Sequence, residues 1–170
     1  MAYAQPLSIN EAPDESKPIL EAIEKKFGQS MNIFSTLAHQ PDVLGGMTQI
    51  NDGLENDLPA KYRELAYYKA SQLNSCDYCS HYHRQAAKKA GLSDEQLDSM
   101  NVSSGDLFDE KERAVLKYAE QLTTKANVDS SVVKELKLFL NEKQLVTLAA
   151  AVALANFTNR INHGLDIELP

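Results

Sequence analysis

The sequence contains no tryptophan, only two cysteines, and few chain-breaking residues, with seven glycines and six prolines among its 170 residues. It also lacks a long hydrophobic run, since the longest one, residues 145–157, is interrupted by Thr147 and Asn156. A helix that spans a bilayer needs about 20 apolar residues, so we predict that this run forms a buried core helix. The first fifteen residues have neither the basic nor the apolar region of a secretory signal.

A surplus of positive charge is absent as well. Lys and Arg number 17 against 24 Asp and Glu, which gives a formal net charge of −7, and no segment is densely basic. Binding to nucleic acid needs clustered Lys and Arg against the phosphates, so we predict no nucleic-acid partner and no membrane partner. Without an export signal we expect a cytoplasmic, reducing compartment, where a close cysteine pair is more often catalytic than structural.

Signals for helix starts and ends divide most of the chain. Ser16 followed by Pro18 predicts a helix start and Gly28 its end, while Ser93 with Gln96 has the spacing of a capping box. The period-two alternation of a strand is nowhere sustained. We therefore predict an all-α fold, with helices over 16–28, 31–39, 43–51, 60–73, 75–91, 94–100, 110–126, 129–140 and 142–163.

The chain shows no internal linker. Residues 1–15 are polar and contain proline, which predicts an extended N-terminal arm. Residues 16–170 are then predicted to form a single all-helical domain, and the Ser-, Gly- and Asp-rich stretch 101–108 a mobile loop. Tyrosines and leucines lie all round the helices at 60–73 and 142–160, which predicts a homo-oligomer, since one small bundle does not hide so much apolar surface.

Both cysteines lie in one short segment, Cys76-Asp77-Tyr78-Cys79-Ser80-His81-Tyr82-His83. Because successive helical residues are about 100° apart, positions 76, 79 and 83 fall within a stripe roughly 60° wide. Two thiols and one imidazole are thus predicted on one buried face, and His81 at the surface. If the cysteines are helical, Cys76 lies in the first turn, where unpaired N–H groups favour an anion.

This arrangement predicts redox chemistry. The thiolate is the nucleophile of cysteine, and a neighbouring base or helix N-terminus promotes it; His83, one turn after Cys79, can accept the Cys79 proton. Attack on a peroxide by one sulfur gives a sulfenic acid, and the second sulfur then condenses with it to a disulfide and releases water. The two cysteines are therefore predicted to cycle between dithiol and disulfide.

Glu64 precedes the motif C-x-x-C-x-x-x-H at 76–83 by twelve residues. This combination resembles the signature of the alkylhydroperoxidase D-like branch of the carboxymuconolactone decarboxylase family. The resemblance is strongest over about residues 35–120, and 156–162 is similar to the family's terminal helix. It implies an all-helical subunit assembled into trimers or hexamers, a hydroperoxide substrate, and an external thiol or lipoyl-type reductant. We predict no metal and no cofactor.

The resemblance also implies roles for four residues. Cys79 meets the peroxide, Cys76 resolves the intermediate, and Glu64 with His83 forms a proton relay that serves both thiols. Some members carry histidine directly before the second cysteine, where this chain has Tyr78, a difference that bears on rate and substrate. For Glu64 to carry protons, it has to be partly buried and its pKa raised towards neutrality, because an ionised carboxylate only disfavours a thiolate beside it.

Other interpretations of the cysteines remain open at this point. They are inert core residues, they bind zinc with His83 and a fourth ligand, or they belong to a lyase that decarboxylates lactones without using them. Zinc is disfavoured because no second Cys/His cluster exists, and haem attachment because Ser80 follows Cys79. We predict a thiol-dependent hydroperoxide reductase or disulfide oxidoreductase.

The i,i+3 spacing predicts a reversible disulfide between Cys76 and Cys79. After mild oxidation and alkylation, mass spectrometry is expected to find the loss of two hydrogens confined to the peptide spanning residues 70–84. Reduction with a dithiol is expected to restore two alkylation sites. Double alkylation that persists after excess peroxide would contradict the prediction.

Overall fold

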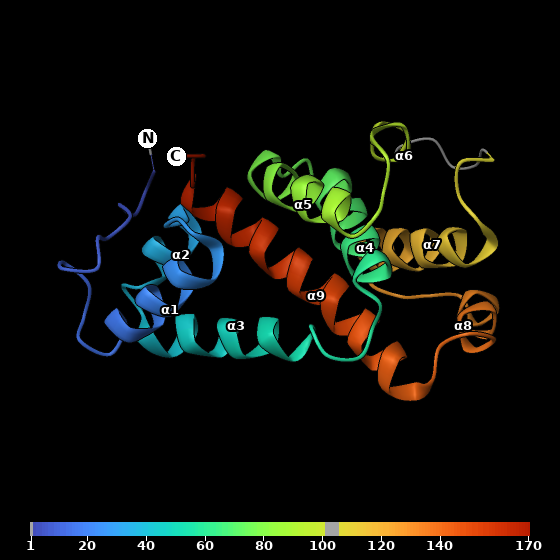
Figure 1. The fold of residues 1–170 in the computed structure, drawn as a ribbon, viewed down its shortest axis with the longest axis horizontal. Helices are drawn as coiled ribbons and strands as arrows, with labels where there is room; N and C mark the ends of the chain where they lie inside the picture. The colour runs from blue at the N-terminus through green and yellow to red at the C-terminus, as the bar shows by residue number, and fades with distance from the viewer. Residues whose placement is uncertain (1, 101–105) are drawn as a thin grey trace. The chain divides into compact units, whose positions relative to one another are not determined.

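The computed structural model describes residues 2–100 and 106–170. Over these residues the protein consists of α-helices without a strand (Figure 1), which confirms the all-α prediction. The helices are α1 (Lys17–Phe27), α2 (Asn32–Leu37), α3 (Pro41–Gly53), α4 (Ala60–Leu73), α5 (Asp77–Lys89), α6 (Asp94–Asp98), α7 (Glu110–Lys125), α8 (Ser130–Lys137) and α9 (Glu142–Leu165). Residues 101–105 of the predicted loop lie outside the described part of the chain.

The predicted helix ends rest on the expected local contacts. α1 carries proline in its first turn and ends at Gly28, whose φ of 73° is the left-handed conformation that glycine adopts most easily. At α6 the Ser93 side chain accepts from the N–H of Gln96, and the Gln96 side chain accepts from the N–H of Ser93. The same reciprocal pair forms at the start of α7. Such bonds satisfy N–H groups that a helix start otherwise leaves unpaired.

Two predicted helix starts are wrong. α3 begins at Pro41 and not at residue 43, because proline fits the first turn of a helix. α5 begins at Asp77 and not at residue 75, because Ser75 has a left-handed φ of 53° and cannot belong to a right-handed helix. Cys76 therefore occupies the N-cap position, with extended backbone, and not the first turn.

The chain divides into two compact units. Unit 1 comprises the residues up to Asp52 together with Arg160–Pro170, and unit 2 comprises Gly53–Asn159. Within unit 1 the stretch before α1 forms no helix, and the N–H of Leu7 donates to the carbonyl of Ser35. The predicted arm boundary and the single domain stay predictions.

Unit 2 is organised around α4, which packs against both α5 and α7, while α7 also packs against α8. Its most deeply buried large side chains are Leu65, Val115, Leu136, Leu148 and Val152. On α9 the inward positions recur every three or four residues, as expected for one buried helix face. The apolar run at 145–157 is thus part of a core helix, as predicted. None of the helices in the described parts of the chain combines the length and apolar character that a bilayer crossing requires.

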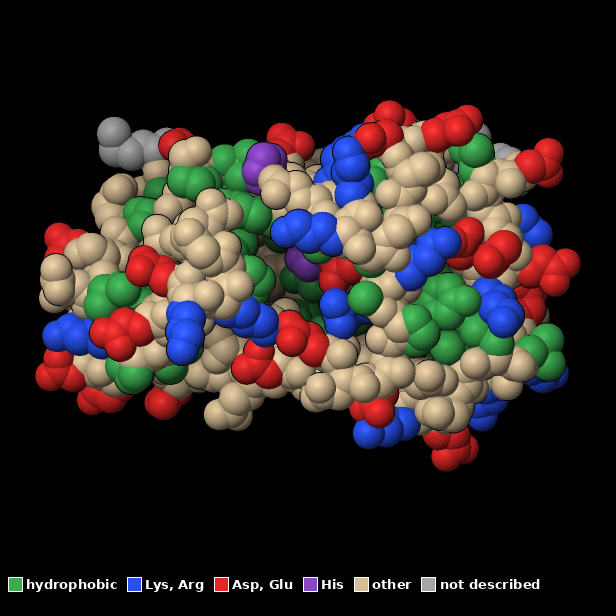
Figure 2. Space-filling model, viewed as in Figure 1, with side chains coloured by type: hydrophobic (Ala, Val, Ile, Leu, Met, Phe, Trp, Pro, Cys, Tyr) green, Lys and Arg blue, Asp and Glu red, His purple; other side chains and the backbone are tan. Residues whose placement is uncertain are grey.

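Some large hydrophobic side chains of unit 2 stay in contact with solvent. Leu138 is 87% exposed and Val146 is 69% exposed, and Figure 2 shows hydrophobic side chains gathered beside α8. Exposed apolar surface of this kind marks sites where chains associate. We propose that these side chains contribute to contacts between copies of the chain.

Sedimentation equilibrium at micromolar concentration is expected to give a mass near a three- or sixfold multiple of the 18.9 kDa monomer. Replacing Leu138 or Val146 by glutamate places a charge in the proposed contact, so the average mass is expected to fall. The matched control is Lys134→Glu, which changes an exposed charge on α8. A monomer mass for the unaltered chain would refute the proposed assembly.

Candidate active site

A tight turn between α4 and α5 brings the cysteines to the end of α5. Its left-handed residue is Ser75, and the N–H of Cys76 donates to the carbonyl of Ser71 at 2.9 Å. Asn74 ties this turn to α9, because its side-chain amide donates to the side-chain oxygens of Asn156 (3.1 Å) and Asn159 (2.8 Å). The N-terminus of α5 is thereby fixed against two other helices.

The two thiols lie in the interior without a disulfide between them. Cys76 is 1% exposed and Cys79 is 5% exposed. The backbone N–H of Cys79 donates to the sulfur of Cys76 at 3.4 Å, so a cysteine here takes the capping role that serine or aspartate commonly has. Because the N-terminal end of a helix carries partial positive charge, this position favours the thiolate of Cys76.

The two sulfurs titrate as a pair. The hydrogen bond to Cys76 raises the pKa of the Cys79 thiol most, and burial and the charge of Cys76 raise it further. Hydrogen bonds between Cys79 and the side chains of Asn159 and Thr158 lower the pKa of this thiol. The pair therefore loses one proton far more readily than a second.

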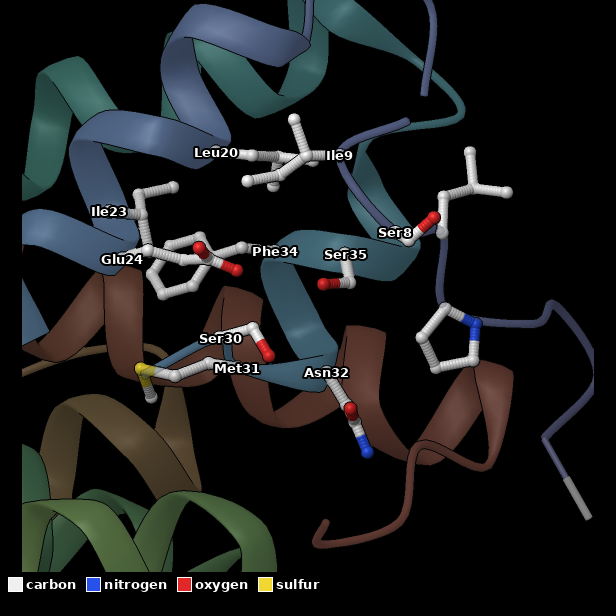
Figure 3. A pocket seen from close by; sticks show the side chains of 12 residues that line it. Ser8, Ile9, Leu20, Ile23, Glu24, Ser30, Met31, Asn32, Phe34 and Ser35 are labelled. Atoms are coloured by element: carbon white, nitrogen blue, oxygen red, sulfur yellow. The ribbon is translucent and has the colours of Figure 1, made fainter. Parts of the chain in front are cut away.

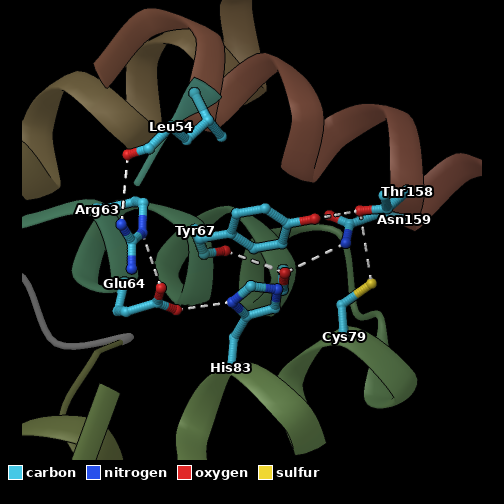
Figure 4. A network of polar contacts seen from close by, with 9 residues as sticks. Leu54, Arg63, Glu64, Tyr67, Cys79, His83, Thr158 and Asn159 are labelled. Carbon is cyan, nitrogen blue, oxygen red and sulfur yellow. Dashed lines mark hydrogen bonds and ion pairs between the residues drawn. The ribbon is translucent and has the colours of Figure 1, made fainter. Parts of the chain in front are cut away.

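Glu64 and His83 form the second part of the site. Glu64 lies on α4 and is buried, and His83 Nδ1–H donates to its Oε2 at 2.8 Å. Arg63 Nε donates to the other carboxylate oxygen at 3.0 Å (Figure 4). The imidazole also stacks on the ring of Tyr67, with 3.5 Å between ring centroids and 16° between planes. The imidazole plane and the Nδ1 proton are thus both fixed.

The expected pKa of Glu64 is corrected by this geometry. Burial raises the pKa of the carboxyl, but the hydrogen bond and charge of His83, together with Arg63, outweigh burial and hold it below its usual value. The prediction of a pKa raised towards neutrality is therefore wrong, whereas the required burial is present. Glu64 remains ionised and orients His83.

The four predicted site residues all lie in unit 2, and His83 faces the interior side of α5 while His81 is exposed. His81 contacts the side chain of Gln85 at 3.1 Å, one turn further along the same helix. The helical projection is thus correct for both histidines. Proton exchange between His83 and Cys79 stays a prediction.

Three contributors were missed from the sequence. Thr158 on α9 accepts a hydrogen bond from the Cys79 thiol at 3.8 Å, its hydroxyl lies 2.6 Å from that of Tyr67, and Asn159 is fully buried beside them. One signal was available: polar residues recur at the end of an otherwise apolar core helix, and buried polar groups need partners. The spacing of these residues in the sequence does not indicate which side chains are their partners.

One cavity of unit 1 does not involve the predicted site residues. A cavity of about 280 Å³ lies within unit 1 (Figure 3), lined mainly by residues of the N-terminal stretch, α1 and α2. Its apolar walls include Leu20, Ile23 and Phe34, and none of the four predicted site residues lines it.

Among the described residues, no group of three or more His, Cys, Asp and Glu side chains is placed to hold a metal ion.

The all-helical fold of the chain is similar to that of solved alkylhydroperoxidase D-like structures. Residues 41–121, just under half of the chain, match the model of the carboxymuconolactone decarboxylase family. This match agrees with the family that the resemblance in the sequence predicted.

Several known proteins are similar to this chain in sequence or in fold. The uncharacterized protein YnjA of Escherichia coli K12 is 29% identical over 107 residues, which span 62% of this chain and 59% of YnjA, less than two thirds of its length. An uncharacterized peroxidase-related protein from Ralstonia eutropha JMP134, solved as an alkylhydroperoxidase AhpD core, is 22% identical with a TM-score of 0.84, covering 99% of this chain and 92% of that one. The debrominase Bmp8, solved with 2,3,4-tribromopyrrole, is 21% identical with a TM-score of 0.84, covering 100% and 92%.

The orientation of the two histidines generates a test with a built-in control. His83→Ala is expected to slow peroxide-driven loss of thiols by roughly 100-fold, the usual range for a lost general base. His81→Ala changes a histidine on the opposite side of the same helix and is expected to have little effect. The measurement is the rate of thiol loss after addition of hydroperoxide, and equal slowing by both variants would overturn the assignment.

The lowered pKa of Glu64 generates a prediction about stability. A carboxyl whose pKa falls on folding stabilises the protein fully above its unfolded pKa of about 4.3, and the stabilisation is lost as the pH falls through the lower folded value. Glu64→Gln removes this titration. The difference in the free energy of unfolding between wild type and Glu64→Gln is therefore expected to shrink as the pH falls below about 5.

Urea unfolding at a series of pH values measures this difference. Glu15→Gln, at an exposed position, is the matched control and is expected to show no such trend. A difference for Glu64→Gln that does not vary with pH would mean that folding leaves the pKa of the Glu64 carboxyl unchanged.

Proposed function

We propose that the protein is a thiol-dependent hydroperoxide reductase in which Cys76 and Cys79 cycle between dithiol and disulfide. The observation that carries the proposal is the arrangement of two buried thiols at the N-terminus of α5, beside an ionised Glu64 that orients His83. Two electrons are available from the pair, and a base with a fixed tautomer lies on the same helix. These are the parts that a peroxide-reducing dithiol requires.

The proposed cycle balances without a bound cofactor. His83 takes one proton from the thiol pair, and the thiolate of Cys79 attacks an oxygen of the hydroperoxide. The O–O bond breaks, Cys79 becomes a sulfenic acid, and the departing alkoxide takes the proton from His83 to leave as an alcohol. Cys76 then attacks the Cys79 sulfur, the S–S bond forms, and the hydroxyl leaves with the Cys76 proton as water. An external thiol or lipoyl-type dithiol returns the two electrons.

Glu64 acts in this cycle through His83. A carboxylate bonded to Nδ1–H holds the imidazole in one tautomer and stabilises the imidazolium that forms when Nε2 takes a proton, as the aspartate does in a hydrolase triad. The ionised state of Glu64 suits this orienting role better than direct proton transfer. Glu64→Gln is then expected to fold normally and to turn over at least about tenfold more slowly.

Reductive debromination is a second candidate. The same dithiol can reduce a carbon–bromine bond: two thiols become a disulfide, bromide leaves, and carbon gains a proton. The likeness to the debrominase Bmp8 over the whole chain favours testing it, although at 21% identity that likeness concerns the fold. Both candidates consume the two thiols, so the substrate decides between them.

Titration of thiols with one equivalent of oxidant tests the proposal. With an alkyl hydroperoxide, wild type is expected to lose both thiols for each peroxide consumed, and Cys76→Ser is expected to stop at a sulfenic acid on Cys79 that dimedone traps. Ser80→Ala, which keeps both sulfurs, is the matched control. Thiol loss with a bromopyrrole but not with hydroperoxide would support the second candidate. Thiols that survive both reagents would overturn a redox function and leave a lyase or a non-catalytic oligomer.

A further inference from the structure

Thr158 on α9 occupies the meeting point of the hydrogen bonds around Cys79. It is 6% exposed, and its hydroxyl oxygen accepts from the Cys79 thiol at 3.8 Å and lies 2.6 Å from the hydroxyl of Tyr67. The same hydroxyl donates to the backbone carbonyls of Leu154 and Ala155, each at 3.1 Å (Figure 4 shows the side-chain contacts). Four groups therefore converge on one hydroxyl in the interior.

The number of hydrogen atoms on each group decides which groups donate hydrogen bonds to Thr158. A threonine hydroxyl has one hydrogen and two lone pairs. With that hydrogen directed at the helix carbonyls, both lone pairs of Thr158 are filled by donors, the thiol of Cys79 and the hydroxyl of Tyr67. Tyr67 keeps its proton for this purpose, because burial and the neighbouring Cys79 charge raise the pKa of its phenol.

The Thr158 hydroxyl is thus able to hydrogen-bond Cys79 in both of its protonation states. When Cys79 carries a proton, Thr158 accepts from it. When Cys79 is a thiolate, the Thr158 hydrogen can rotate from the carbonyls of Leu154 and Ala155 to the sulfur, while Tyr67 continues to donate to the oxygen. The carbonyls lose little, since carbonyls within a helix also accept from a backbone N–H. A donor to a thiolate makes a charge-assisted bond, the stronger kind.

Asn159 stands beside Thr158 with its amide held from both sides. Its Oδ1 accepts from Asn74 at 2.8 Å, and its Nδ2 donates to the hydroxyl of Ser71 at 3.2 Å. These bonds fix the amide with its NH₂ group towards α4 and α5, and it also hydrogen-bonds Cys79. Thr158 and Asn159 together present two donors to the same sulfur.

Contacts from α5 and from α9 therefore favour different positions for the single negative charge of the pair. The N-terminus of α5 favours the charge on Cys76, through the N–H of Cys79 and the partial positive charge of the helix end. α9 favours the charge on Cys79. The titratable groups that surround the pair are Glu64 and Tyr67 from α4 and His83 from α5; α9 contributes only the neutral Thr158 and Asn159.

We propose that Thr158, held by Tyr67, is a positioning residue that places the thiolate on Cys79 and so selects which sulfur of the pair reacts. The inference rests on the dithiol chemistry proposed above, but it concerns the distribution of charge and not the substrate. The device lies outside the cysteine motif, on a helix about eighty residues away in the sequence.

Competition for a small alkylating reagent tests this assignment directly. Protein is treated with less than one equivalent of iodoacetamide, and fragment spectra give the ratio of Cys79 to Cys76 modification. Thr158→Val keeps the shape and removes the hydroxyl, and it is expected to lower this ratio by about tenfold, the effect of a lost hydrogen bond to a charged group. Tyr67→Phe is expected to lower it by less, and Thr158→Ser to restore it.

The matched control is Thr147→Val on the same helix, whose hydroxyl donates to the carbonyl of Lys143 just as Thr158 bonds back to its own helix. This variant loses the same kind of bond far from the sulfurs and is expected to leave the ratio unchanged. A ratio in Thr158→Val equal to that of wild type, or a serine variant that fails to rescue it, would overturn the proposal.

A second measurement covers variants with low alkylation yield. In a Cys76→Ser background, thiolate absorbance at 240 nm reports the ionisation of Cys79 alone, and Thr158→Val is expected to move its midpoint to higher pH. An unmoved midpoint would also overturn the proposal. Neither readout uses a peroxide, so failure of the proposed function leaves a distinct signature: normal sulfur selectivity without thiol loss on addition of hydroperoxide.

Discussion

The hydrogen-bonded pair of buried cysteines at the start of α5 is the constraint on which the site in unit 2 depends. Cys76 accepts the N–H of Cys79 at the start of α5, and the thiol of Cys79 donates to Thr158. A buried charge is costly unless several donors surround it. The left-handed turn at Ser75 and the anchoring of Asn74 are the backbone features that put these donors within reach.

Glu64 is also a buried group whose charge is stabilised by surrounding hydrogen-bond donors. The carboxylate is buried, yet it remains ionised because Arg63 donates to one oxygen and His83 to the other. Stacking on Tyr67 removes the last rotational freedom of the imidazole. The site thus holds one base in a fixed orientation, at the expense of keeping a charged group away from water. Tyr67 connects the two parts of the site, because its ring stacks on His83 while its hydroxyl contacts Thr158, which in turn contacts Cys79.

α9 has two functions in this structure that usually fall to different elements. Its apolar positions, such as Leu148 and Val152, complete the core of unit 2, and the polar residues at the end of the same buried face contact the turn before α5 and the sulfur of Cys79. A polar side chain in a core stabilises a fold only when all its hydrogen bonds are made. The asparagine and threonine side chains therefore fix the rotation of α9 about its axis as well as the site.

The sequence alone determined the helices and the face that the reactive residues share. Capping at Ser93 and a left-handed end at Gly28 are decided by a few neighbouring residues, and a period of 3.6 places Cys79 and His83 on one face of a helix. Only the tertiary structure decided that Glu64 is buried yet ionised and that Thr158 meets Cys79. Both depend on partners from other helices, and periodicity specifies which face of a helix is buried but not what packs against it.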